Sequence, residues 1–228
     1  MTTRAWHSGF TLIEVMVALV VMSVLALMSW RGVSGMASAQ TLTQARSDEV
    51  LQLQTALAQW QTDLDAVTDT QQVTPLEFNG VSLRMTRRDQ RGNVFVTAWA
   101  VRQSEGRLRW LRWQSVALNN RSELLAAWAQ AQRWAQNPGD EERLREVAVT
   151  DVDDWEIYYF RNDAWTNPQS ADAAGDSPGA AAPGAPGAPV RATVPDGVRM
   201  VLKLTPGRSV SGVLTRDWVR PSLGGGKS

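Results

Sequence analysis

Gly9-Phe10-Thr11-Leu12-Ile13-Glu14-Val15 opens an apolar segment that continues to Trp30. The 21 residues from Phe10 to Trp30 correspond to about 31 Å of helix, enough to cross the hydrocarbon core of a membrane. After Glu14, only two serines interrupt the apolar residues. A carboxylate in such a segment costs roughly 2.5–3.5 kcal/mol near the bilayer centre. The sequence therefore predicts a transmembrane helix over residues 10–30, and Glu14 is expected to have a partner.

The residues before this segment argue against a secretory signal peptide that is removed whole. Such a signal has its small-residue cleavage site after the apolar stretch. Here a short basic head, with Arg4 and His7, ends at the small pair Ser8-Gly9, before the apolar stretch. A cut at this pair would leave the apolar segment on the protein as an anchor. Arg4 and the amino terminus favour a cytoplasmic head, so the rest of the chain is expected on the other side of the membrane.

The stretch from Gly9 to Glu14 resembles the processing motif of type IV pilins and type II secretion pseudopilins. The resemblance implies that a prepilin peptidase cuts after Gly9, that Phe10 becomes a methylated N-terminus, and that Glu14 is the fifth mature residue. Residues 1–9 would then be a leader peptide. It also implies an α+β, pilin-like fold, in which a long N-terminal helix, its first half transmembrane, packs on antiparallel β-sheets. The location implied is the bacterial inner membrane, with a single pass and a periplasmic C-terminal domain.

Physical chemistry gives Glu14 a role that agrees with this resemblance. In a filament of such subunits, the anchors leave the lipid and pack together as a helical bundle. A buried Glu14 carboxylate would be costly unless the amine of a neighbouring subunit's Phe10 neutralised it. Such a pair would set the axial register of the subunits. The alternative is that Glu14 only extends to the membrane interface.

Composition excludes several classes of function. Lysine plus arginine number 23 and match 23 acidic residues, so no basic surface is expected to attract nucleic acid. The chain has no cysteine, and its one histidine, His7, lies in the predicted leader. The mature chain would therefore lack Ser-His-Asp sites, Cys-His sites and the usual zinc sites. The two lysines, Lys203 and Lys227, stand in no recognisable motif. The protein is not expected to be an enzyme.

After the anchor, the same helix is expected to continue over residues 31–69. Glycine in a helix costs about 1 kcal/mol relative to alanine, so Gly32 and Gly35 mark a soft point, or alternatively a break into a loop. Further on, apolar residues at alternating spacings of three and four form one stripe: Val50, Leu53, Leu57, Trp60, Leu64 and Val67. The stripe is expected to lie on a β-sheet rather than in a coiled coil. Polar residues are expected on the other faces: Gln52, Gln54, Gln59, Gln61, Asp63 and Asp65.

Residues 70–223 are expected to form a periplasmic, β-rich globular domain. Alternating patterns and turn signals such as Asn79-Gly80 predict strands at 76–78, 81–85, 94–101, 108–113, 155–161, 198–204 and 210–218. A short helix is predicted at 122–134, with Ser122 as N-cap and with Leu125, Trp128 and Gln132 along one side. Residues 168–190 are rich in alanine, proline and glycine and indicate a flexible insertion. Residues 224–228 indicate a disordered tail.

Two further patterns bear on binding. Asp151, Asp153 and Asp154 are weak candidates for calcium ligands, because clustered carboxylates can supply the oxygen ligands that calcium takes. Some relatives in the resembled family also bind calcium in the soluble domain. Without a recognised calcium loop, a solvated acidic loop is the favoured interpretation, and no cofactor is expected. The ten tryptophans after the leader are expected to lie mostly in the core, with one or two at a partner surface.

Weaker cues point to one member of the family. Ser29-Trp30-Arg31-Gly32-Val33, the segment Leu57–Leu64, and the strand Trp155–Phe160 with Trp165 after it resemble the J-type minor pseudopilin of type II secretion. The K-type lacks glutamate at the fifth mature position, whereas Glu14 is present here. The helix at 122–134 and the insertion depart from the J-type pattern.

The J-type resemblance implies that the protein is a structural subunit and catalyses no reaction. The implied partners are the I- and K-type pseudopilins of a tip complex, the prepilin peptidase and the inner-membrane assembly platform. Alternatives are a minor pilin of a type IV pilus and a membrane-tethered binding module, for example for sugars. A membrane-anchored hydrolase and a competence-type pseudopilin that takes up DNA are less favoured.

Overall fold

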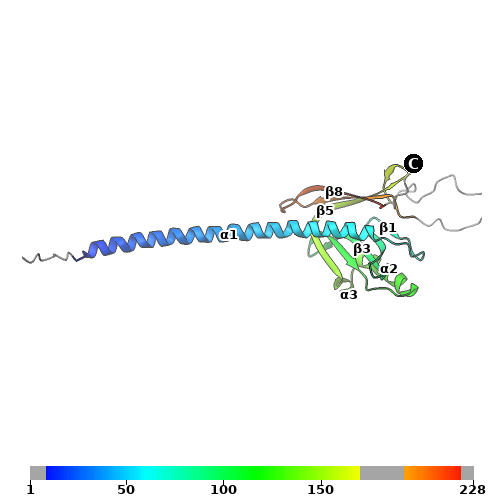
Figure 1. Ribbon diagram of the computed structural model, residues 1–228, viewed down its shortest axis with the longest axis horizontal. Helices are drawn as coiled ribbons and strands as arrows, with labels where there is room; N and C mark the ends of the chain where they lie inside the picture. The colour runs from blue at the N-terminus through cyan, green and yellow to red at the C-terminus, as the bar shows by residue number, and fades with distance from the viewer. Residues whose placement is uncertain (1–8, 170–192, 222–228) are drawn as a thin grey trace, which may run out of the picture. The chain divides into compact units, whose positions relative to one another are not determined.

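The computed structural model describes residues 9–169 and 193–221, which are drawn in colour in Figure 1. The predicted leader up to residue 8, the tail at 224–228 and nearly all of the predicted insertion at 168–190 lie outside the described residues. The chain divides into two compact units, one up to Asp48 and one from Glu49 onward. The first helix, α1 (Leu12–Asp65), contributes to both units.

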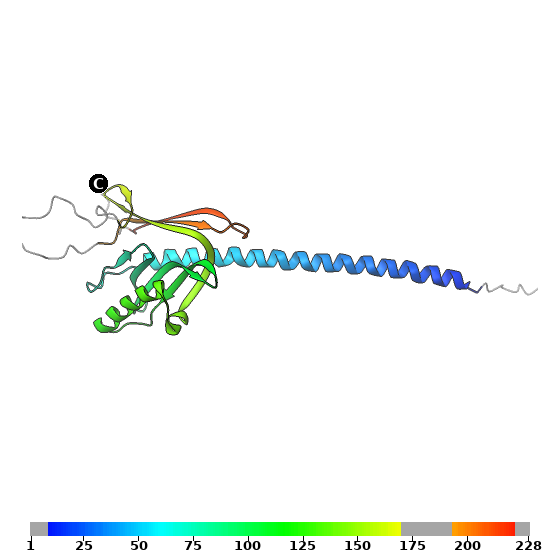
Figure 2. The same cartoon turned by 180° about the vertical axis from the view of Figure 1, so that it is seen from behind.

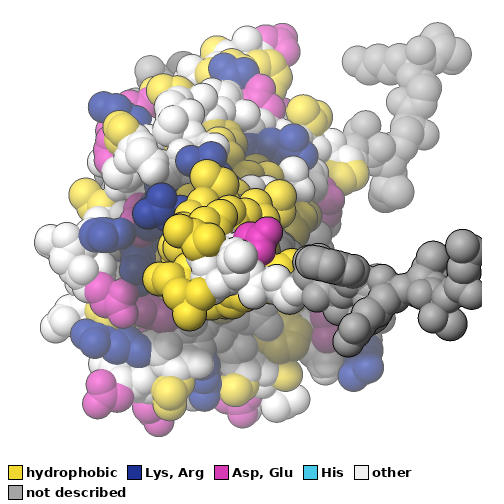
Figure 3. Space-filling view, turned by 90° about the vertical axis from the view of Figure 1, so that its left-hand side faces the viewer, with side chains coloured by type: hydrophobic (Ala, Val, Ile, Leu, Met, Phe, Trp, Pro, Cys, Tyr) yellow, Lys and Arg dark blue, Asp and Glu magenta, His cyan; other side chains and the backbone are white. Residues whose placement is uncertain are grey.

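In the first unit, α1 carries exposed apolar side chains on all sides. Figure 3 shows them in yellow around the near end of the helix. Among the described residues, α1 is the one helix long and apolar enough to cross a membrane. Some of its hydroxyl groups bond within the helix: those of Ser23, Thr41 and Thr43 donate to the carbonyl oxygens four residues earlier. The helix continues through Gly32 and Gly35, so the alternative of a break into a loop is wrong.

The second unit contains an eight-stranded antiparallel sheet. Its strands are β1 (Leu76–Phe78), β2 (Ser82–Arg88), β3 (Val94–Ser104), β4 (Arg107–Gln114), β5 (Glu146–Arg161), β6 (Ala164–Thr166), β7 (Gly197–Leu204) and β8 (Gly212–Val219). They are ordered β1-β2-β3-β4-β5-β7-β8, and β6 pairs with the end of β5. The fold class is α+β, with a long N-terminal helix on an antiparallel sheet, as predicted.

Strand β5 joins the two halves of the sheet. Its residues 146–151 pair with β4, whereas its residues 152–160 pair with β7. The register of β5 shifts between Val152 and Asp154, and such a bulge bends a strand. The prediction of a strand only over residues 155–161 missed the first half of β5, because Asp151, Asp153 and Asp154 were interpreted as a loop.

The last turns of α1 pack on the sheet and form the first hydrophobic core. Figures 1 and 2 show this part of α1, in cyan, running past β1 and β3 on one side and β5 and β8 on the other. Leu53, Trp60 and Leu64 are buried here, and Leu57 and Val67 pack partly buried against them. The predicted stripe is therefore confirmed as a core face. The helix ends at Asp65, four residues earlier than predicted.

Tryptophan rings fill much of this core. Trp60 meets Trp99 edge-on, with ring centroids 5.5 Å apart, and Trp99 stacks on Trp110 at 4.5 Å. Both partners lie on the sheet face that α1 covers. The prediction that most tryptophans are core residues is confirmed, since six of them are among the largest fully buried side chains: Trp60, Trp99, Trp110, Trp113, Trp134 and Trp218.

A second core lies on the opposite face of strands β3 and β4, under α2 (Arg121–Gln136). The helix was predicted, but its N-cap was not. Asn120 caps α2, its Oδ1 accepting from the Glu123 amide at 2.9 Å, so the assignment of Ser122 is wrong. The buried face of α2 consists of Leu124, Ala127, Ala131, Trp134 and Ala135, and Trp128 packs partly buried against the same core. A short helix that was not predicted, α3 (Asp140–Arg143), follows.

Candidate functional site

The residues of the predicted processing site lie at the very start of α1. Gly9 and Phe10 precede the helix, and the Phe10 side chain is 87% exposed. Thr11 is the last residue before the helix. The peptide bond that a peptidase would cut is thus in a non-helical, exposed segment.

Glu14 forms a reciprocal cap with Thr11 at the N-terminus of α1. The Thr11 amide and the Thr11 hydroxyl each donate to Glu14 Oε2 at 2.9 Å. In return, the Glu14 amide donates to Thr11 Oγ1 at 3.4 Å. This is the capping-box arrangement, in which a threonine and a glutamate three residues later satisfy the free amides of the first turn.

The sequence analysis missed this contact, although the pattern Thr-x-x-Glu indicates it. The expected partner of Glu14 was the amine of a neighbouring Phe10. In the uncut chain, the Phe10 nitrogen is part of a peptide bond and carries no charge. An amine can appear there only after cleavage, so Thr11 is the partner that Glu14 has within the chain before processing.

The three calcium candidates do not come together. Asp151 is buried and pairs with Arg107 at 3.1 Å, with Arg109 at 3.3 Å and also with Arg208. Asp153 accepts from the Thr205 hydroxyl at 2.9 Å, and Asp154 accepts from the amide of Trp155. Within the described part of the chain, no group of three acidic residues, histidines or cysteines could hold a metal ion. The interpretation of this segment as a solvated acidic loop is wrong, because Asp151 lies in β5.

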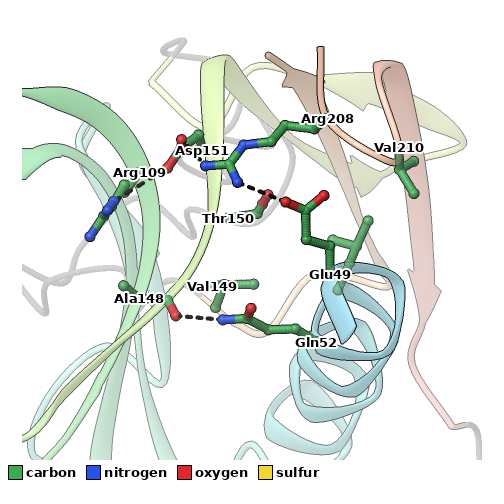
Figure 4. A pocket seen from close by; sticks show the side chains of 10 residues that line it. Glu49, Gln52, Arg109, Ala148, Val149, Thr150, Asp151, Arg208 and Val210 are labelled. Atoms are coloured by element: carbon green, nitrogen blue, oxygen red, sulfur yellow. Dashed lines mark hydrogen bonds and ion pairs between the residues drawn. The ribbon is translucent and has the colours of Figure 1, made fainter. Parts of the chain in front are cut away.

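Asp151 belongs to a polar pocket of about 200 Å³ between α1, β5 and the loop that joins β7 to β8 (Figure 4). Arg208, from that loop, bridges the Asp151 carboxylate and Glu49 Oε1, the latter at 2.9 Å. The Ser209 hydroxyl and amide donate to Glu49 Oε2 at 2.6 and 3.1 Å. These bonds, with the positive charge of Arg208, lower the pKa of Glu49 to about 2. Every charged group that Figure 4 labels is paired, so the pocket serves to tie α1 to the loop.

A second carboxylate of α1, Asp63, is fully buried. Its oxygens accept from Arg112 Nε at 2.8 Å, from Arg112 Nη2 at 3.0 Å and from the Trp99 indole at 2.9 Å. Gln59 and Arg87 donate to it as well. The placement of Asp63 on a polar face of the helix was wrong. No sequence signal marks it, because its arginines come from distant strands.

Comparison with known proteins agrees with the N-terminal geometry. Residues 7–30 match the family model described as the prokaryotic N-terminal methylation motif. This is the type IV pilin signal. The match spans Gly9, Phe10 and Glu14 together with the apolar part of α1. With that helix, the pilin signal fits a single-pass membrane anchor.

The remaining comparisons concern the chain beyond this N-terminal segment. No curated protein matches the sequence. Among solved structures, the fold is similar to a chain in the crystal structure of the GspK-GspI-GspJ complex from the type 2 secretion system of enterotoxigenic Escherichia coli. That likeness covers 75% of this chain and 96% of the other, at 13% identity and a TM-score of 0.40.

Proposed function

We propose that this chain is a minor pseudopilin of a type II secretion system, of the J-type. It would act as a structural subunit of the tip complex that initiates the pseudopilus, the filament that pushes folded proteins across the outer membrane. The observation that carries the proposal is the pilin signal, with Glu14 at the fifth position after the cleavage site and an apolar helix behind it. The subunit would catalyse no reaction, and the work assigned to it needs no cofactor.

The proposal gives each signal residue a defined role. A prepilin peptidase cuts between Gly9 and Phe10 and methylates the new N-terminus. Glu14 then exchanges its hydrogen bonds with Thr11 for an ion pair with the Phe10 amine of a neighbouring subunit. This exchange is favourable in a dry helical bundle, because an ion pair compensates the buried carboxylate better than neutral donors do.

The proposed location and partners follow from the same role. The chain would span the inner membrane once, with its short N-terminus in the cytoplasm and the second unit in the periplasm. Its partners would be the I- and K-type pseudopilins, the prepilin peptidase and the inner-membrane assembly platform. The J-type assignment is supported by the segments around Trp30 and Trp60 and by the presence of Glu14.

Mass spectrometry of the mature N-terminus tests the proposal directly. We expect a chain that begins with methylated Phe10 when the protein is made together with its prepilin peptidase. The same chain with Gly9→Ala serves as the control, because a side chain at the cleavage site should block cutting and leave the leader in place. An intact leader on the native chain would contradict the proposal.

A minor pilin of a type IV pilus carries the same signal and is the second candidate. Deletion of the gene distinguishes the two. Loss of protein secretion with pili retained supports the pseudopilin, whereas loss of surface pili with secretion retained supports the pilin.

A further inference from the structure

A groove of about 340 Å³ lies beside α1 in the second unit. One wall is a single stripe of the helix, made of Gln52, Thr55, Ala56 and Gln59. The other wall is Val147–Val149 of β5, where the Val147 side chain is 59% exposed. The helix wall is therefore mostly polar and the strand wall apolar, and Gln52 Nε2 donates across the groove to the Ala148 carbonyl oxygen at 3.2 Å. From Gln52 to Gln59 the groove is about 10 Å long at 1.5 Å per residue.

Arg112, which also lines the groove, belongs to a buried cluster with an unbalanced charge. Arg87 and Arg112 both pair with Asp63, and the side chains of the three are 14%, 15% and 0% exposed. The ion pairs found among the described residues give neither arginine a second carboxylate. One positive charge is thus left over in a largely dry environment, where an uncompensated charge is costly.

We propose that this groove receives a helix from another pilin-like subunit, and that a carboxylate on that helix pairs with Arg112. The carboxylate would balance the surplus charge, while apolar side chains one turn away would cover Ala56 and Val147. A helix fits because the groove runs along two turns of α1, and the small Ala56 lets a second helix approach closely. The inference rests on the proposed function, since a filament subunit meets other subunits through their long helices.

Cysteine cross-linking tests this contact with little background, because the native chain has no cysteine. Val147→Cys is introduced into the full chain, in cells that make the other filament subunits with the same N-terminal signal. Each of those subunits carries one cysteine, moved position by position along its long helix. In one of the subunits, we expect disulfides between Val147→Cys and those cysteines that lie on one stripe of the long helix, at positions three or four residues apart. Replacing the acidic residue of that stripe by its amide should reduce cross-linking at least fivefold.

Val213→Cys is the matched control, because Val213 is a similarly exposed valine, at 70%, on β8 and outside the groove. Equal cross-linking from both positions, cross-linking without a helical period, or cross-linking only between two copies of this chain would overturn the proposal.

A second variant, Val147→Trp, fills the groove with a large uncharged side chain at an exposed position. We expect it to abolish incorporation into the filament without changing the thermal unfolding of the chain. Normal incorporation of this variant would also contradict the inference. The proposed function is scored separately, by methylation at Phe10 and by dependence on Glu14, so the failure of one is distinguishable from the failure of the other.

Discussion

Residues 12–48 and residues 49–65 belong to the same helix but use their side chains in opposite ways. In the first part, apolar side chains such as Leu19 and Trp30 are exposed, and hydroxyl groups such as that of Ser23 bond to the helix itself. In the second part, Trp60 and Leu64 are buried, and the helix also buries a charge, Asp63. The first part therefore offers a surface to lipid or to other helices, whereas the second part is a structural element of one domain.

The difference shows that an acidic residue in a helix can have two unrelated purposes. Among the described residues, Glu14 accepts its hydrogen bonds from Thr11, within one turn, so these bonds can be exchanged when the surroundings change. Asp63 accepts hydrogen bonds from side chains on three strands, β2, β3 and β4, and cannot change partner without loss of the fold. Four substitutions or conditions test this comparison.

Glu14→Ala should have the largest effect on assembly and the smallest on stability. We expect filament incorporation to fall at least a hundredfold, since the subunit loses the carboxylate that we propose pairs with a neighbour. Thermal unfolding of the second unit should be unchanged, because Glu14 belongs to the first unit and its hydrogen bonds among the described residues go to Thr11. Sedimentation of sheared filaments followed by immunoblotting measures the first, and circular dichroism measures the second. Asp48→Ala, an exposed acid on the same helix, is the control and should leave both unchanged.

Asp63→Ala should affect the stability of the second unit, which Glu14→Ala leaves unchanged. We expect it to lower the free energy of unfolding by about 3–5 kcal/mol, because it leaves Arg87 and Arg112 buried without a carboxylate. Chemical denaturation of the full chain in detergent measures the change. Asp48→Ala is again the matched acid and should shift the midpoint little. An equal effect of both substitutions would mean that the buried cluster does not hold α1 to the sheet.

Acid should weaken the contact between Glu49 and the β7–β8 loop. The pKa of Glu49 is about 2 in the folded chain against an ordinary value of 4.5, so the unfolded chain binds the proton more tightly. The contribution of Glu49 to stability is therefore complete above about pH 4.5 and disappears as the pH falls toward 2. Unfolding of the native chain and of Glu49→Gln should differ at pH 7 and converge at low pH. A difference that does not change with pH would contradict the ion pair.

Asn120→Ala should have the smallest effect, a loss of about 1 kcal/mol, since it removes the side-chain acceptor at the start of α2. Ser122→Ala is the control, because Ser122 was the predicted cap and lies inside the helix. Hydrogen exchange at the Glu123 amide should rise in the first variant and not in the second. Equal exchange in both variants would show that Asn120 does not cap the helix.

Local patterns were enough for the parts of the fold that depend on neighbours in sequence. The stripe from Val50 to Val67, the hairpin at Asn79-Gly80 and the two last strands were predicted, because spacing and turn chemistry are local properties. The N-cap of α2 and the reciprocal cap of Thr11 and Glu14 are also local. The first was missed because Ser122 was taken as the N-cap. The second was missed because Glu14 was expected to pair with the Phe10 amine of another subunit.

Other features could not be predicted, because they depend on residues far apart in the chain. The first half of β5 contains aspartates that disfavour a strand, and Asp151 becomes acceptable there only beside Arg107, Arg109 and Arg208. Asp63 looked like any polar helix residue until the arginines of β2 and β4 were placed around it.

The sequence by itself determined the long apolar segment, the signal around Glu14 and the presence of a long helix followed by antiparallel strands. The length of a segment, its apolar content and the position of one charge are properties of consecutive residues. The free energy of inserting such a segment into a membrane follows directly from the transfer free energies of its residues. Only the tertiary structure decided which acidic residues of the second unit are buried and where a groove remains beside α1. Ion pairs and cavities arise from side chains that meet across strands, and no spacing along the chain specifies those meetings.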